Sequence, residues 1–131
     1  MIFIICTEFL ALKVKEEQNI LGFELPNKKV IKISQFADDT CVYLKNMDQI
    51  ESCINTINIF SNITGLKLNL EKTEGLRLGS NQERMPCSFG IQWPKTPIRY
   101  LGIYIGKDYN KCKLNNWTFK IEKMQKLIDS W

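Results

Sequence analysis

The amino-acid sequence predicts an α+β fold in which helices cover a small antiparallel sheet. Apolar residues recur at intervals of three and four in three segments, which is the period of an amphipathic helix. Between these segments, β-branched and apolar residues alternate with polar ones, as they do in strands. The expected order is helix, hairpin, helix, strand, strand, helix. With 131 residues, 44% of them hydrophobic, the chain is expected to form one domain with a modest core.

The first helix is expected at the very start of the chain. Phe3, Cys6, Leu10 and Val14 share one helical face, which predicts a buried helix with partners on several sides. A secretory signal peptide is not indicated, because no basic residue precedes the apolar run and Glu8 interrupts it. The run is also too short to span a bilayer, so no membrane partner is expected.

A β-hairpin is predicted around the sequence KISQFADDTCVYL. One strand is expected over residues 30–33 and a second over residues 40–44, because both are rich in β-branched or aromatic residues. Ala37, Asp38 and Asp39 lie between them, and Asp is a common turn residue.

Two more helices are indicated by their apolar stripes. The second is expected to be capped by Asn46 or Asp48 and to end at Thr64-Gly65. The third is expected over residues 117–131, with Asn115 or Asn116 as its cap. Its stripe is predicted to be helix core rather than a base-stacking surface, and it comprises Trp117, Ile121, Met124, Ile128 and Trp131.

The remaining strands are expected between these two helices. Leucines alternate with polar residues at positions 66, 68 and 70 and again at 76 and 78, which predicts a β-region. Three prolines exclude a continuous central strand from the segment SNQERMPCSFGIQWPKTPIR. The segment IRYLGIYIGK after it is strongly β-like.

Composition excludes several kinds of catalytic site. The chain has no histidine, so catalytic triads, Cys-His pairs and His-ligated zinc are ruled out. The number of cysteines, five, is odd, and none of them form a Cys-x-x-Cys pair, which indicates reduced thiols. Reduced thiols in turn indicate an intracellular protein, in the nucleus or the cytoplasm. The formal net charge of +4 suits a polyanionic partner without requiring one.

Two interpretations of the adjacent carboxylates Asp38 and Asp39 are open. As a turn sequence, Ala-Asp-Asp-Thr needs no function, because Asp tolerates tight backbone geometry. As a metal site, the loop would present carboxylate oxygens to hard divalent cations, which prefer oxygen ligands. A pair of such ions can activate a 3′-hydroxyl and stabilise a leaving pyrophosphate.

The motif FADDT resembles the aspartate pair of reverse transcriptases, in the form found in non-LTR, LINE-type retrotransposons. Other segments of the chain resemble further blocks of that family, in the family's order. They are FIICTEFLAL before the pair and GLKLNLEKTEGLRLG, IRYLGIYIG and LNNWTFKIEKMQKLIDSW after it. The resemblance implies a partial polymerase palm over residues 1–106 and the start of a thumb-like helical segment over residues 107–131.

The resemblance implies roles for particular residues. Asp38 corresponds to a metal ligand, for Mg²⁺ or Mn²⁺, with Asp39 as a supporting carboxylate. Lys72 corresponds to a proton donor or triphosphate ligand, although a solvated lysine beside a strand would look the same. Tyr100, Leu101 and Gly102 resemble the primer grip, where Gly102 and Gly106 suit a close backbone approach. Phosphate contacts are expected from three lysines of the last helix, which are Lys120, Lys123 and Lys126.

In the family, the implied partners are an RNA template, a DNA primer and deoxynucleoside triphosphates. The family's site also needs a further aspartate on an earlier strand, and no segment resembling that strand precedes the pair. We therefore expect the isolated chain not to polymerise DNA. The alternative is a non-catalytic remnant of a retrotransposon with at most weak nucleic-acid binding.

Overall fold

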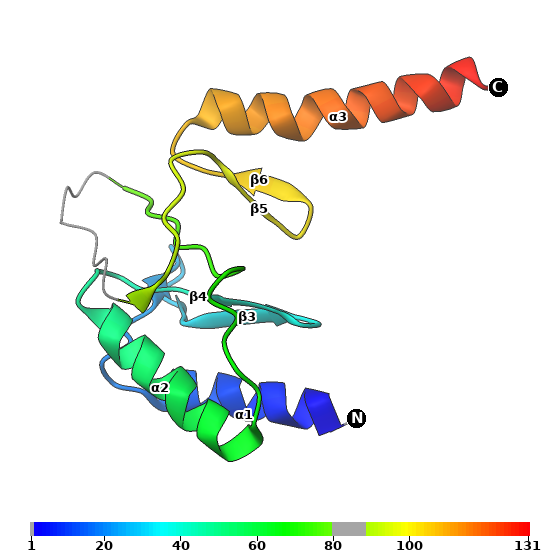
Figure 1. Cartoon of the computed structure of the whole chain (residues 1–131). Helices are drawn as coiled ribbons and strands as arrows, with labels where there is room; N and C mark the ends of the chain where they lie inside the picture. The colour runs from blue at the N-terminus through cyan, green and yellow to red at the C-terminus, as the bar shows by residue number, and fades with distance from the viewer. Residues whose placement is uncertain (1, 80–88) are drawn as a thin grey trace. The chain divides into compact units, whose positions relative to one another are not determined.

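The computed structural model describes residues 2–79 and 89–131 (Figure 1). It confirms the α+β class. The single domain expected from composition is not observed, because the described residues make their contacts within two compact units. Unit 1 contains residues 2–69 together with residue 89, and unit 2 contains residues 70–79 and 90–131.

Unit 1 consists of two helices and two small antiparallel hairpins. The helices are α1, Ile2–Glu16, and α2, Gln49–Thr64. The first hairpin pairs β1, Phe23–Glu24, with β2, Val30–Ile31. The second pairs β3, Ile33–Phe36, with β4, Asp39–Val42. The sequence predicted a hairpin here, but its first strand begins at Ile33 and not at Val30, because residues 30–31 pair with β1.

The core of unit 1 lies where α1, α2 and β3 meet. Helix α1 buries Leu10, Ala11 and Val14, all in its second half, against Ile33 of β3 and Phe60 of α2. Phe3 was expected to be buried but is 45% exposed. The reason is that the buried partners cover only the second half of α1.

Helix α2 lies where it was predicted and ends as expected, but the expected side-chain cap at its start does not form. It follows Asp48, whose side chain makes no capping hydrogen bond, and it ends before Gly65. Gly65 has a φ of 76° and donates its N–H to the Ser61 carbonyl at 2.8 Å, which is a left-handed helix end. The buried Gln49 was not anticipated; its Oε1 accepts hydrogen bonds from the backbone N–H of Leu21 at 3.0 Å and of Lys45 at 3.3 Å.

Unit 2 contains a third hairpin and a long helix. β5, Ile98–Tyr100, pairs with β6, Ile103–Ile105, and α3 spans Tyr109–Asp129. The leucine alternation over residues 66–78 was a wrong prediction of strands, since only an isolated bridge forms there, between Glu74 and Gln92. Period-two alternation needs a neighbouring strand to pair with, and these leucines have none in the described residues.

Helix α3 begins earlier than predicted. Asp108 is its N-cap, with a carboxylate oxygen that accepts from the Lys111 N–H at 3.0 Å, so Asn115 and Asn116 are not caps. The predicted core stripe is also wrong, since its side chains are at least 58% exposed. Only Cys112 of α3 is buried among the described residues, because the short β5–β6 hairpin covers just the start of the helix.

Two other sequence-based expectations can be compared with the described residues. Cys6, Cys41, Cys53 and Cys112 are free thiols, whereas Cys87 lies outside the described residues. Within residues 2–79 and 89–131, every helix is too short or too polar to cross a membrane.

Candidate functional site

The aspartate pair lies at the tip of the β3–β4 hairpin. Phe36 of β3 pairs with Asp39 of β4, so Ala37 and Asp38 form a two-residue turn. Ala37 has a φ of 53°, and Asp38 is not among the residues with positive φ. Positive φ at the first turn position alone is the pattern of a type II′ turn, which matches the twist of the two strands.

The strand register gives the hairpin two different faces. Ile33 and Val42 are paired and pack on the core with α1, and the Gln35 Nε2 donates to the Thr7 carbonyl at 3.1 Å. Because side chains alternate along a strand, the opposite face carries Asp39 and Cys41. Asp39 is therefore directed away from α1.

Polar contacts occupy the face that carries Asp39. Ser34 Oγ and Tyr43 Oη lie 3.1 Å apart, close enough for a hydrogen bond. Burial raises the pKa of the neighbouring Cys41 thiol, and a hydrogen bond with Tyr43 lowers that pKa in part. Cys41 is thus a protonated thiol at neutral pH rather than a nucleophilic thiolate.

Asp38 and Asp39 are both exposed to solvent. Water and salt screen the repulsion between their charges, so the fold does not require a bound cation to tolerate them. The exposure also leaves their oxygens open to ligands. The turn and metal-site interpretations are both compatible with this geometry.

The two aspartates are ligands of the type that a hard divalent cation prefers, but two side chains are too few to hold one tightly. Carboxylate oxygens are the ligands that Mg²⁺ and Mn²⁺ prefer. Among the described residues, no group of three or more His, Cys, Asp or Glu side chains is placed to hold a metal ion. The hairpin therefore supplies two oxygen-donating side chains to a site that needs further ligands.

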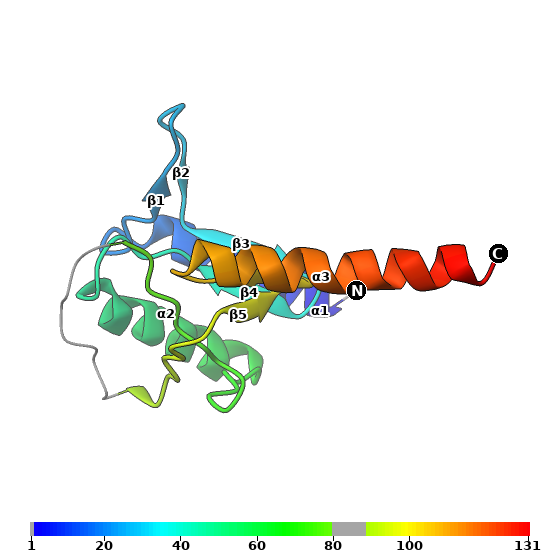
Figure 2. The same cartoon turned by 90° about the horizontal axis from the view of Figure 1, so that it is seen from above.

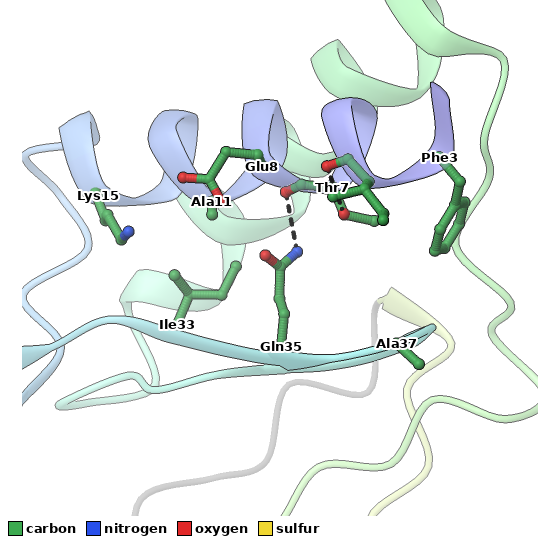
Figure 3. A pocket seen from close by; sticks show the side chains of 9 residues that line it. Phe3, Thr7, Glu8, Ala11, Lys15, Ile33, Gln35 and Ala37 are labelled. Carbon is green, nitrogen blue, oxygen red and sulfur yellow. Dashed lines mark hydrogen bonds between the residues drawn. The ribbon is translucent and has the colours of Figure 1, made fainter. Parts of the chain in front are cut away.

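A groove of about 440 Å³ runs between α1 and β3 and reaches Ala37 in the turn (Figure 3). The Gln35 side chain stands across it, with its hydrogen bond to the Thr7 carbonyl. Charged side chains reach this groove only from α1, where Glu8 and Lys15 lie. Its other lining residues are Phe3, Ile4, Ala11 and Ile33.

Lys72 belongs to unit 2, in a turn that the Thr73 N–H closes on the Leu70 carbonyl at 3.3 Å. Its side chain is exposed, whereas the sequence suggested a position beside a strand.

Tyr100, Leu101 and Gly102 form the tight end of the β5–β6 hairpin. Tyr100 pairs with Ile103, and Leu101 and Gly102 have φ values of 48° and 79°. Positive φ at both turn positions is the type I′ pattern, in which a leucine is strained. At Gly106 a Cβ would lie 3.0 Å from the Pro97 Cα, so a close backbone approach occurs there, as expected. The same expectation is wrong for Gly102, where a Cβ would meet nothing within 4 Å and the glycine serves the positive φ of the turn instead.

Three of the lysines of α3, Lys120, Lys123 and Lys126, are exposed and follow one another at intervals of three. Lys120 Nζ lies 6.0 Å from the centre of the Trp117 ring, which is within reach of a cation–π contact. The spacing turns successive lysines about 60° around the helix, so Lys120, Lys123 and Lys126 form a winding basic band.

The hairpin turn thus exposes two adjacent carboxylates whose oxygens are open to ligands. Residues 1–105 match the family model described as reverse transcriptase (RNA-dependent DNA polymerase), and the chain belongs to this family. The family uses divalent metal ions, a nucleic-acid template and deoxynucleoside triphosphates. The match includes the aspartate hairpin and ends at the last residue of β6, before α3.

Proposed function

We propose that this chain supplies the aspartate hairpin of a reverse transcriptase of the non-LTR, LINE type, for RNA-templated DNA synthesis. The observation that carries the proposal is the exposed pair Asp38-Asp39 at a two-residue turn, in a chain that belongs to the family. The FADDT form of the motif supports the LINE type. On this proposal residues 1–106 are part of the palm, and residues 107–131 begin the thumb.

Asp38 is the proposed ligand of Mg²⁺ or Mn²⁺, and Asp39 supports it from the first position of β4. When bound, two such ions would activate the primer 3′-hydroxyl and neutralise charge on the leaving pyrophosphate. Lys72 is the proposed triphosphate ligand or proton donor, because an exposed ammonium group is a point charge suited to phosphate.

The isolated chain is proposed to be inactive as a polymerase. The described residues bring no third acidic, histidine or cysteine side chain to the aspartate pair. Positioning and electrostatic stabilisation provide most of the catalysis in phosphoryl transfer, so an incomplete ligand set loses both. A further carboxylate from another segment or chain is needed.

Nucleic-acid contacts are proposed for two parts of unit 2. The β5–β6 turn at Tyr100, Leu101 and Gly102 would hold the primer end, and its positive φ values give it a fixed shape. The basic band of Lys120, Lys123 and Lys126 would contact phosphates without reading sequence. A reducing, intracellular location in the nucleus or cytoplasm is part of the same proposal.

The first test of this function is to measure the binding of Mn²⁺ to the whole chain by isothermal titration calorimetry. We expect weak binding, on the order of millimolar, which Asp38→Asn weakens at least about tenfold because it removes a charged ligand. Asp48→Asn is the matched control, since Asp48 is exposed and its side chain makes no capping bond. Equal affinities of the wild type and Asp38→Asn would contradict the metal site.

The second candidate is a non-catalytic remnant with at most weak nucleic-acid binding. The two-member carboxylate set favours it. Binding of an RNA–DNA hybrid separates the two candidates, because phosphate contacts make affinity fall steeply with salt. Affinity that is absent, or unaffected by salt, would support the remnant.

A further inference from the structure

The β1–β2 hairpin projects from the rest of unit 1 (Figure 2). We call residues 22–31 the arm. The arm takes no part in the aspartate turn, and none of the roles assigned so far uses it. Its tip and its base are both fixed by hydrogen bonds, and its surface carries basic and aromatic side chains.

The tip is a three-residue loop of defined geometry. The Leu25 N–H donates to the Lys29 carbonyl, and the Lys28 N–H donates to the Leu25 carbonyl, both at 2.8 Å. Pro26 and Asn27 thus occupy the centre of a β-turn, and Lys28 follows with a φ of 64°. This is the hairpin loop in which a turn is followed by a left-handed residue.

Lysine is an unexpected residue at the left-handed position of this loop. Glycine adopts that conformation without steric cost and is the usual occupant. Lys28 adopts this conformation in the loop at the tip of the arm, where it is exposed to solvent. Strained residues of this kind concentrate at functional surfaces.

The base of the arm is anchored to the end of α1. Lys32 Nζ donates to the carbonyl oxygens of Lys15 at 2.9 Å and of Glu17 at 2.7 Å, which satisfies backbone groups at the helix end. At Gly22 the φ is +72°, and a Cβ would lie 2.6 Å from the Ile31 carbonyl oxygen. These contacts hold the base of β1 and β2 close together beside the end of α1.

The surface of the arm combines positive charge with an exposed aromatic ring. Lys28 and Lys29 are both exposed, and Glu24 is the only acidic residue between positions 22 and 31. Phe23 is 57% exposed and Val30 is 48% exposed. The strand register places Phe23 and Lys29 on the same face of the hairpin, since Lys29 lies opposite Leu25. A surface that combines exposed lysines with an exposed aromatic ring is typical of sites that bind single-stranded nucleic acid, through phosphates and through base stacking.

We propose that the arm is a nucleic-acid contact, in which Lys28 and Lys29 bind backbone phosphates and Phe23 stacks on an unpaired base. The inference rests on the proposed function, which supplies a nucleic acid as partner. It adds a contact surface that is separate from the aspartate turn, the β5–β6 turn and the lysines of α3. A preorganised tip loses little freedom on binding, so each phosphate contact contributes fully to affinity.

The test measures binding of an RNA–DNA hybrid with a single-stranded template overhang, by fluorescence anisotropy from 50 to 200 mM salt. Lys28→Gly removes the charge and relieves the strained backbone, so the variant should fold at least as well as the wild type. We expect its Kd to rise about sixfold at 0.1 M salt, with a log–log salt slope smaller by about 0.7 to 0.9. Lys28→Arg should keep the wild-type slope.

Lys45→Ala is the matched control, because it removes one exposed lysine elsewhere in unit 1. We expect its Kd to stay within about twofold of the wild type. Phe23→Ala should weaken binding of the overhang substrate and leave a blunt duplex unaffected, as stacking needs an unpaired base.

Four results would overturn the inference. Equal losses in Lys28→Gly and Lys45→Ala would mean that only overall charge matters, and an unchanged slope in Lys28→Gly would remove the phosphate contact. Binding to phosphatidylserine vesicles that is tighter than binding to the hybrid, and that depends on Lys28, would assign the arm to a membrane surface instead. A wild-type chain with no affinity for the hybrid would refute the proposed function as well, whereas the first two results leave that function standing.

Discussion

Replacement of Asn116 by alanine should detach α3 from the β5–β6 hairpin. The Asn116 Oδ1 accepts from the Tyr104 N–H at 2.7 Å, and its Nδ2 donates to the Tyr104 carbonyl at 2.9 Å. These two bonds satisfy the backbone of an edge strand that would otherwise face solvent. A net stabilisation of about 1 kcal/mol for each bond gives a loss of about 2 kcal/mol in Asn116→Ala.

The assay is hydrogen exchange of the Tyr104 amide, followed by NMR. A loss of about 2 kcal/mol corresponds to exchange that is roughly 30 times faster. Asn115→Ala is the control, since Asn115 is the same residue type, is exposed and is the neighbouring position on the helix. Similar exchange rates for Tyr104 in Asn116→Ala and in the wild type would refute this account of how α3 is held.

Two further predictions concern the stability of unit 1. Burial raises the pKa of the Cys53 thiol from 9.0 to about 11, so the unfolded chain loses this proton first and the folded state is favoured below about pH 9. The free energy of unfolding, measured by urea titration, should therefore fall between about pH 9 and 11. The fall should be up to about 3 kcal/mol larger in the wild type than in Cys53→Ala. Parallel pH profiles of the two proteins would contradict this. Gly22→Ala should lower the free energy of unfolding by about 1–3 kcal/mol, and by more than Gly65→Ala does. Both glycines have positive φ, but only Gly22 leaves no space for a Cβ. Equal losses of stability in urea titration would show that small shifts relieve the contact with the Ile31 carbonyl.

The elements that sequence predicted well are those with a strong local period and clear end signals. Helix α2 was placed correctly because its apolar face is continuous and Thr64-Gly65 ends it. The aspartate hairpin was predicted because β-branched residues flank a turn sequence, although its first strand begins three residues later than expected. In both cases the short-range preferences of the chain agree with the final packing.

The predictions that failed depended on partners distant in sequence. Leucine alternation after Gly65 suggested strands, but an alternating segment remains irregular when no strand pairs with it. Asn116 resembled a helix cap, whereas Asp108 caps α3 and Asn116 binds the edge of β6. Both errors come from reading a residue's local preference where a tertiary contact decided its role.

The candidate site divides in the same way. The adjacent carboxylates and the absence of histidine could be read directly, and they limited the chemistry to oxygen ligands. The strained backbone of Lys28 could not be predicted from the sequence, since Pro26-Asn27-Lys28 contains no glycine to mark a left-handed residue. Only the hydrogen bonds across the loop assign that conformation to the lysine.

Local periodicity and side-chain chemistry were enough to predict the fold class and a hairpin around the aspartate pair, although Asp39 is the first residue of β4 and not part of the turn. Tertiary structure alone decided which face of the hairpin Asp39 occupies, since this depends on the register against Phe36 and on the packing of Ile33 beneath α1. It also decided that the apolar stripe of α3 is exposed, because burial is a property of the neighbours that a helix has and not of its own pattern.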